Sequence, residues 1–208
     1  MNAHPLAGLI AGGARFVTGV NASWKEHRPE DRQTVFFANH SSHLDFAVLW
    51  ASLPSHVRRT TRPVAAQDYW ESGVRRWVAV DVFNAILVPR HGSAAPSSQR
   101  AAETIDRIAE DMGDAFSIII FPEGTRGDGE EVAAFKSGLY HLCQRKPDLQ
   151  LVPVYMENLN RILPKGQFLP VPFICRVNFG EPAAYAPGED KAAFLERMRD
   201  ALCALRSQ

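Results

Sequence analysis

The feature that most constrains the fold is a run of aromatic and β-branched residues, Phe-Ser-Ile-Ile-Ile-Phe, at residues 116–121. A continuous apolar run of this length is typical of a strand in a parallel sheet that helices cover on both faces. Other strand-like runs recur along the chain and alternate with stretches of helical periodicity. These further predicted strands are 34–38, 62–66, 85–88, 149–156 and about 173–179. The alternation predicts an α/β fold with a largely parallel central sheet flanked by helices.

Helical spacing of apolar residues predicts the connecting elements. The expected helices cover 43–53, 68–80, 97–112 and 135–145, and a last one carries Phe194, Met198, Ala201 and Leu205 on one face. A chain of 208 residues favours a single domain. We expect an N-terminal amphipathic helix within residues 1–24 and the main domain at 25–208. This helix either associates with a membrane or packs on the body of the protein. Arg15 interrupts this segment, so we do not expect it to span a bilayer.

Charge and cysteine content exclude some classes of protein. Lysine plus arginine equals aspartate plus glutamate, at 23 each, so no overall field points to nucleic acid. Arginines gather locally, however, and this basic stretch suits a phosphate-bearing ligand or a phospholipid surface. Its members are Arg58, Arg59, Arg62, Arg75, Arg76 and Arg90. The three cysteines show no CxxC spacing, which indicates inert thiols in a reducing compartment.

The stretch Asn-His-Ser-Ser-His-Leu-Asp at residues 39–45 allows three interpretations. His40, His43 and Asp45 are possible zinc ligands, but no further His/Cys cluster supports a metal site. Ser42 and Asp45 fit a capping box at a helix start, which leaves His40 without a role. If His40 lies in the turn after the strand and Asp45 in the first helical turn, the carboxylate orients the imidazole as a general base. The last interpretation uses both residues.

A second polar motif, Pro-Glu-Gly-Thr-Arg, follows the strand at 116–121. Ligand groups in α/β sheets gather at the carboxyl ends of the strands. Arg126 offers a planar fork for a phosphate, Thr125 offers a hydroxyl, and Gly124 lets backbone amides approach an anion. Glu123 can accept a hydrogen bond from a ligand hydroxyl or orient an arginine. The motif therefore predicts a binding site for a phosphorylated ligand.

Together, the two motifs resemble the paired signature of the glycerol-phosphate and lysophosphatidate acyltransferase family, N-H-x-x-x-x-D and F-P-E-G-T-R. Residues 84–90, Asn-Ala-Ile-Leu-Val-Pro-Arg, and residues 151–156 resemble two further blocks of that family. The resemblance implies that His40 is the general base and that Asp45 orients it. It also implies an acceptor-binding set with Lys136 as an additional candidate, and no metal or prosthetic group. That set is Arg90, Glu123, Gly124, Thr125 and Arg126.

By this resemblance, residues 25–208 are an acyltransferase domain that moves a fatty acyl group from acyl-CoA or an acyl carrier protein to the glycerol hydroxyl of a lysophospholipid. Lysophosphatidate is the expected acceptor, and we expect the protein to be cytoplasmic and peripheral on an anionic membrane surface. Asn84 and Pro89 depart from the family pattern, which keeps another lysophospholipid or a lyso-aminolipid open as the acceptor. A lipid-binding protein without turnover is the alternative from a different class.

Overall fold

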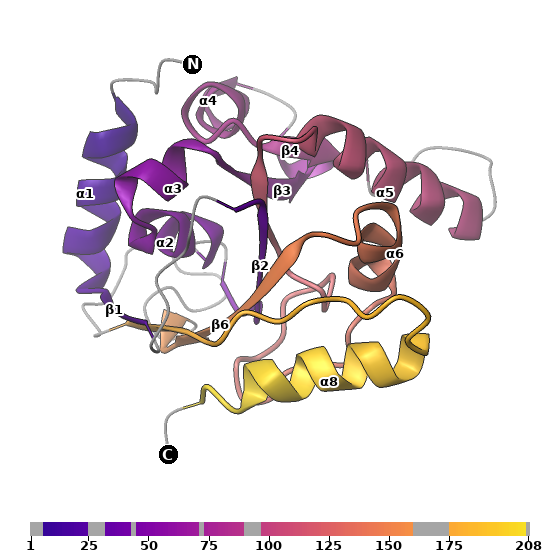
Figure 1. The fold of residues 1–208 in the computed structure, drawn as a ribbon. Helices are drawn as coiled ribbons and strands as arrows, with labels where there is room; N and C mark the ends of the chain where they lie inside the picture. Colours follow the sequence, from indigo (N-terminus) through magenta and orange to yellow (C-terminus); the bar gives the residue numbers. More distant parts are fainter. Residues whose placement is uncertain are drawn as a thin grey trace.

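A computed structural model describes residues 6–24, 32–42, 45–70, 73–89, 97–159 and 175–206. Within these ranges the chain forms a seven-stranded sheet in the order β1-β7-β6-β2-β5-β3-β4 (Figure 1). The strands are β1 (Asn21–Trp24), β2 (Thr34–Ala38), β3 (Thr61–Ala66), β4 (Ile86–Val88), β5 (Ser117–Ile120), β6 (Gln150–Glu157) and β7 (Arg176–Phe179). All neighbouring pairs are parallel except β6 and β7, which are antiparallel. The predicted α/β fold with a largely parallel sheet is confirmed.

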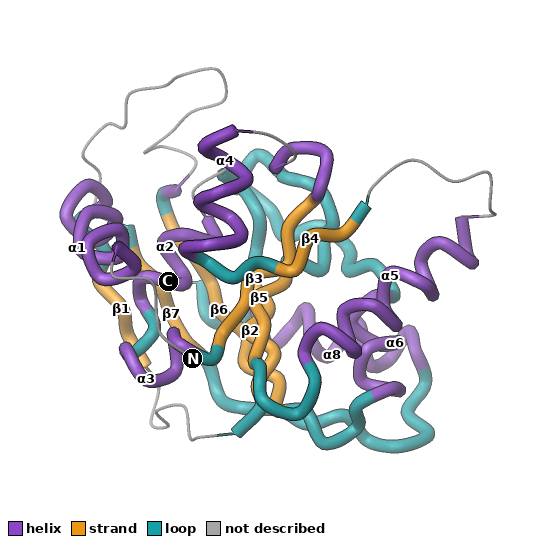
Figure 2. Tube along the Cα trace, turned by 90° about the horizontal axis from the view of Figure 1, so that it is seen from above, coloured by secondary structure: helices purple, strands orange, loops and turns teal. Residues whose placement is uncertain are grey.

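Helices cover both faces of the sheet (Figure 2). One layer contains α1 (Leu6–Thr18), α2 (Asp45–Ser52), α3 (Ser55–Arg59) and α4 (Gly73–Trp77). The other contains α5 (Ser97–Met112), α6 (Gly138–Arg145) and α8 (Lys191–Cys203). The five residues of β2 are all buried because this central strand has a helical layer on each side.

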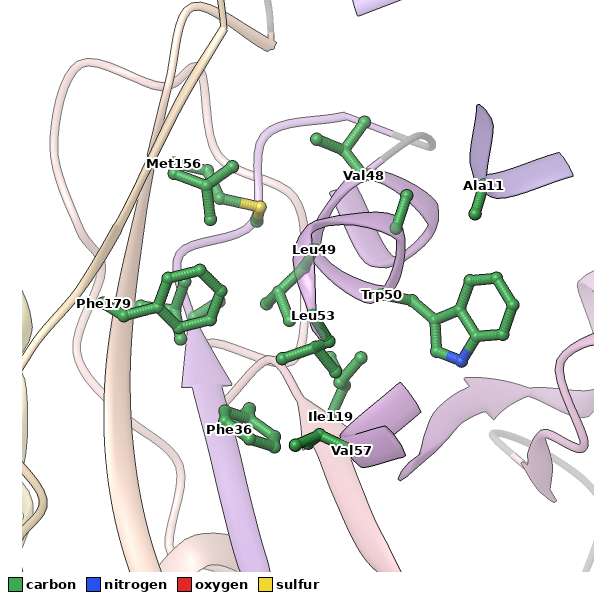
Figure 3. Close-up of a cluster of buried hydrophobic side chains, with 14 of the residues drawn as sticks. Ala11, Phe36, Val48, Leu49, Trp50, Leu53, Val57, Ile119, Met156 and Phe179 are labelled. Atoms are coloured by element: carbon green, nitrogen blue, oxygen red, sulfur yellow. The ribbon is translucent and has the colours of Figure 1, made fainter. Parts of the chain in front are cut away.

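Alternate residues of β2 enter two separate cores. Phe36 and Ala38 pack in the cluster under α1 and α2, whereas Val35 and Phe37 pack under α5, α6 and α8. Figure 3 shows the first cluster, in which Phe36 and Leu49 lie near Phe179. The two-residue period of a strand thus supplies both cores from one apolar run.

The N-terminal segment is more closely joined to the domain than the division at residue 24 suggests. Residues 21–24 form the edge strand β1, which pairs with β7, and the Trp24 ring stacks on Phe179 with centroids 3.6 Å apart. Helix α1 packs on α2, and Arg15 Nε donates a hydrogen bond of 2.7 Å to the carbonyl of Ala51. The helix in 1–24 is therefore present, but it ends at Thr18 and a strand follows it. None of the helices in the described ranges is both long and apolar enough to cross a membrane.

The helix expected at 68–80 is divided into three short pieces. A 3₁₀ turn, η1 (Gln67–Trp70), precedes α4, and a π-helical turn, η2 (Val78–Val82), follows it. The chain then turns at Asn84, whose φ of 51° is left-handed, and enters β4.

Candidate active site

Two parallel neighbouring strands bring the polar motifs together. In the ladder between β2 and β5, Phe37 is paired with Ile120. Both strands therefore end at the same edge of the sheet, His40 in the turn after β2 and Pro122 in the turn after β5. The imidazole of His40 lies against the ring of Phe121, with centroids 4.3 Å apart and planes inclined by 20°. Strand pairing thus brings the two motifs into contact although they are about 80 residues apart in the sequence.

The His40 imidazole and the Asp45 carboxylate are hydrogen-bonded. Nδ1 of His40 lies 2.7 Å from Oδ2 of Asp45, which is fully buried at the first position of α2. The same oxygen accepts from the amides of Ser41 at 2.6 Å and Ser42 at 2.8 Å. An ionised carboxylate accepts only, so Nδ1 carries the proton and Nε2 keeps a lone pair. Asp45 therefore combines the helix-capping geometry with orientation of the ring.

Glu123 holds the main chain of His40 in place. Its Oε1 accepts from the His40 amide at 2.8 Å, and its Oε2 accepts from the Ala133 amide at 2.9 Å. The carbonyl of His40 in turn accepts from the Gly127 amide at 2.8 Å. Glu123 is buried, and burial raises the pKa of its carboxyl, against which the two amide hydrogen bonds act. Sequence reasoning took Glu123 as a ligand group and missed this bracing of the histidine turn.

An apolar cavity of about 250 Å³ lies beside His40. Its polar members are few, and its walls come from β3, β4, β5, α5 and α6. The aliphatic residues lining it are Val64, Val88, Ile105, Ile108, Ile120, Leu139 and Leu142. Such a chamber suits an alkyl chain, because transfer of methylene groups from water to an apolar wall is favourable.

Gly124 and Lys136 meet at the rim of this cavity. Gly124 has a left-handed φ of 71°, and a Cβ at this position would lie 2.8 Å from Lys136 Nζ. The Lys136 amide donates to the carbonyl of Pro122 at 2.8 Å, so the lysine is fixed over the turn. Its ammonium lies at the rim of the cavity that His40 also lines and is therefore a candidate partner for an anionic group, and a Cβ on residue 124 would force the end of this side chain to shift.

The other predicted phosphate-binding residues are placed differently. Thr125 and Arg126 are exposed on the turn and are not among the residues that line the cavity. Arg90 lies outside the described residues. In the part of the chain that is described, no group of three His, Cys, Asp or Glu residues could hold a metal ion. His43 also lies outside it.

A sequence profile described as Acyltransferase matches residues 19–157, which include both motifs and most of the cavity wall. The chain belongs to the acyltransferase family. It is 29% identical over 135 residues to 1-acyl-sn-glycerol-3-phosphate acyltransferase alpha of Ovis aries, which covers 64% of this chain and 42% of that protein. It is 28% identical over 166 residues to a protein named Taffazin from Dictyostelium discoideum, covering 74% of this chain and 54% of that protein. The acyltransferase chain thus spans about half the length of these relatives or less.

Comparison with solved structures supports the same fold. The crystal structure of the 1-acyl-sn-glycerophosphate acyltransferase PlsC from Thermotoga maritima superposes with a TM-score of 0.70. The similarity covers 98% of this acyltransferase chain and 80% of that one, at 18% sequence identity. At that identity the similarity establishes only the architecture. The reaction has to be inferred from the side chains of the site.

Proposed function

We propose that the protein is an O-acyltransferase that moves a fatty acyl group from an acyl thioester to the free glycerol hydroxyl of a lysophospholipid. The observation that carries the proposal is the His40–Asp45 pair, 2.7 Å apart, at an apolar cavity of about 250 Å³. Acyl-CoA or an acyl carrier protein is the proposed donor.

His40 acts as the general base in the proposed reaction. Its Nε2 takes the proton of the acceptor hydroxyl as the oxygen bonds to the thioester carbonyl carbon. Asp45 stabilises the imidazolium that forms. The tetrahedral intermediate then collapses, the carbon–sulfur bond breaks, and the imidazolium returns the proton to the leaving thiolate. The products are the diacylated lipid and a free thiol.

Lysophosphatidate is the proposed acceptor, and the cationic groups near the site support it. Lys136 lines the cavity, and Arg126 lies one residue before Gly127, whose amide binds the His40 carbonyl. A phosphate monoester offers oxygens for both side chains, and Arg90 is the third candidate from sequence. Another lysophospholipid or a lyso-aminolipid is the second candidate, favoured by the departures at Asn84 and Pro89. The proposed location is the cytoplasmic face of an anionic membrane.

Release of free thiol from oleoyl-CoA in the presence of lysophosphatidate tests the reaction directly. We expect His40→Ala to lower kcat by about 10²–10⁴, which is the usual contribution of a general base. The matched control is His56→Ala, which removes an exposed imidazole from α3 and should leave the rate unchanged. Full activity of His40→Ala would reject the base. Lysolipid binding without thiol release from any donor would favour the non-catalytic alternative, and a panel of headgroups distinguishes the acceptors.

A further inference from the structure

Exposed apolar side chains are concentrated in two segments of the described chain. Helix α1 exposes Leu6, Leu9 and Phe16, and the remaining large hydrophobic residues that are exposed are Tyr69, Val74, Trp77 and Val80. Phe16 is 89% exposed and Val74 is 76% exposed. A few exposed apolar residues are normal for a protein surface, but their concentration in two helical regions indicates a contact surface.

In the second segment, residues 73–82, the exposed and the buried apolar residues lie on different sides. Val74, Trp77 and Val80 recur at every third position, while Ala79 and Val82 face the core. The segment shares its supporting core with α1, because Val78 and Ile10 pack against the same buried cluster. Figures 1 and 2 show α1 and α4 on the same side of the sheet, opposite α5, α6 and α8.

The same segment begins near the catalytic edge of the sheet and leads back to the start of β4. It follows the carboxyl end of β3, which is parallel to β5 and pairs with it directly. Since β5 leads into the turn containing Phe121 and Glu123, residues that follow β3 emerge at the same edge as His40. A bilayer that contacts the start of this segment would therefore lie near the edge of the sheet that carries His40.

Two arginines accompany the apolar residues. Arg75 and Arg76 are exposed, and Arg75 lies over the ring of Tyr69, with 4.9 Å between Cζ and the ring centroid. Asp81 is the one acidic residue in 73–82. An aromatic residue at half exposure between aliphatic residues and arginines matches the requirements of a bilayer interface with anionic lipids.

Two other arginines of the basic stretch, Arg58 and Arg62, make contacts within the fold. Arg58 donates to the Ala51 carbonyl and lies over the Trp50 ring at 5.0 Å. Arg62 donates to the carbonyls of Asn84 and Asp111. The ring of Trp24 is likewise stacked within the fold, on Phe179.

We propose that the α4 patch, formed by Val74, Arg75, Arg76, Trp77 and Val80, is a membrane-contact element that binds an anionic phospholipid bilayer at the catalytic edge. The apolar side chains enter the boundary between headgroups and acyl chains, and the two arginines bind lipid phosphates. Helix α1 provides a second contact on the same side. This proposal rests on the proposed function, since a lysolipid acceptor and a long-chain product reside in such a bilayer.

Vesicle flotation with the full chain tests the α4 patch. Vesicles of phosphatidylcholine are compared with vesicles that also contain phosphatidylglycerol. We expect Val74→Ser/Trp77→Ser/Val80→Ser to bind both kinds roughly tenfold more weakly, because apolar burial is lost. Arg75→Gln/Arg76→Gln should lose the preference for anionic vesicles, by about fivefold for each arginine. The matched control, Arg107→Gln/Arg145→Gln, removes the same charge from α5 and α6 and should bind as the wild type does.

Two further measurements separate the possible outcomes. Hydrogen exchange of wild-type amides in 73–82 should slow when anionic vesicles are added, and this readout requires no variant to fold. Turnover of water-soluble short-chain substrates should be equal in the wild type and the α4 variants, because these substrates need no membrane. If the wild type does not turn them over, the proposed function fails, and vesicle binding still tests the α4 patch. Unchanged vesicle binding by both α4 variants would overturn the proposal. A dimer that the triple variant dissociates, with vesicle binding intact, would also overturn it and assign the patch to self-association.

Discussion

At the scale of single residues, His40 is held from three directions, by Asp45 five positions away and by Phe121 and Glu123 more than 80 positions away. Asp45 binds the ring edge at 2.7 Å, Phe121 covers the ring face, and Glu123 binds the backbone amide at 2.8 Å. A general base gains most from such restraint, because its proton acceptor must stay within hydrogen-bonding reach of the hydroxyl. In the proposed reaction this bracing gives Glu123 a positioning role.

Glu123→Gln should lower kcat more than it raises KM for the acceptor. Its amide nitrogen would face either the His40 or the Ala133 amide, so one buried donor loses its acceptor, at a cost of about 1–3 kcal/mol in stability. Steady-state kinetics with lysophosphatidate measure the split, and Glu131→Gln on the exposed loop is the control. A large rise in KM with unchanged kcat would instead support the direct contact with the acceptor that sequence reasoning expected.

At the scale of secondary-structure elements, the site is assembled from strand ends and helix starts. Parallel pairing of β2 and β5 aligns the two motifs, and α2 begins at Asp45. Its far end is held by α1 through the hydrogen bond from Arg15 to Ala51. The cavity is formed where α5 and α6 cover β3, β4 and β5. Helix packing therefore decides its length.

Gly138 at the start of α6 offers a way to shorten the cavity. A Cβ at this position would lie 3.4 Å from Ile105 Cδ1, across the cavity wall. We expect Gly138→Leu to reduce turnover of long-chain thioesters by roughly tenfold relative to short ones, because it fills space that the chain would occupy, at about 0.8 kcal/mol for each excluded methylene. Competition between oleoyl and hexanoyl donors measures the ratio. Gly138→Ala adds one methyl group and is the control, and an unchanged ratio in Gly138→Leu would place the acyl chain elsewhere.

At the scale of the whole molecule, the sheet divides the protein into two cores with different tasks. The core under α5, α6 and α8 surrounds the cavity, and the core under α1 and α2 supports the exposed α4 patch. His40 follows β2, the middle strand of the sheet, and therefore lies at the boundary between the two cores. This arrangement lets one side meet the proposed bilayer while the other holds the proposed acyl chain.

Global stability should carry a pH dependence from Glu123. Folding raises the pKa of this carboxyl by burial above its ordinary value of 4.5, so the native state binds the proton more tightly than the unfolded state. The contribution of this group to the free energy of unfolding therefore falls as pH rises from the ordinary value through the raised one. Urea denaturation between about pH 4 and about pH 8 should show the difference between wild type and Glu123→Gln shrinking with pH. A difference that grows with pH would mean that the amide hydrogen bonds outweigh burial.

The sequence by itself determined the parts of this protein that depend on local pattern. The apolar runs predict the central strands, and the turn after residue 38 explains how His40 meets Asp45 five positions later. Only the tertiary structure decided the role of Glu123, since its partner His40 lies 83 positions away. The edge strand 21–24 and the cavity likewise escaped prediction. Short-range periodicity reports burial and helix starts, whereas contacts between distant residues exist only after strands pair and helices pack. Here those contacts position the proposed base, His40, and shape the cavity beside it.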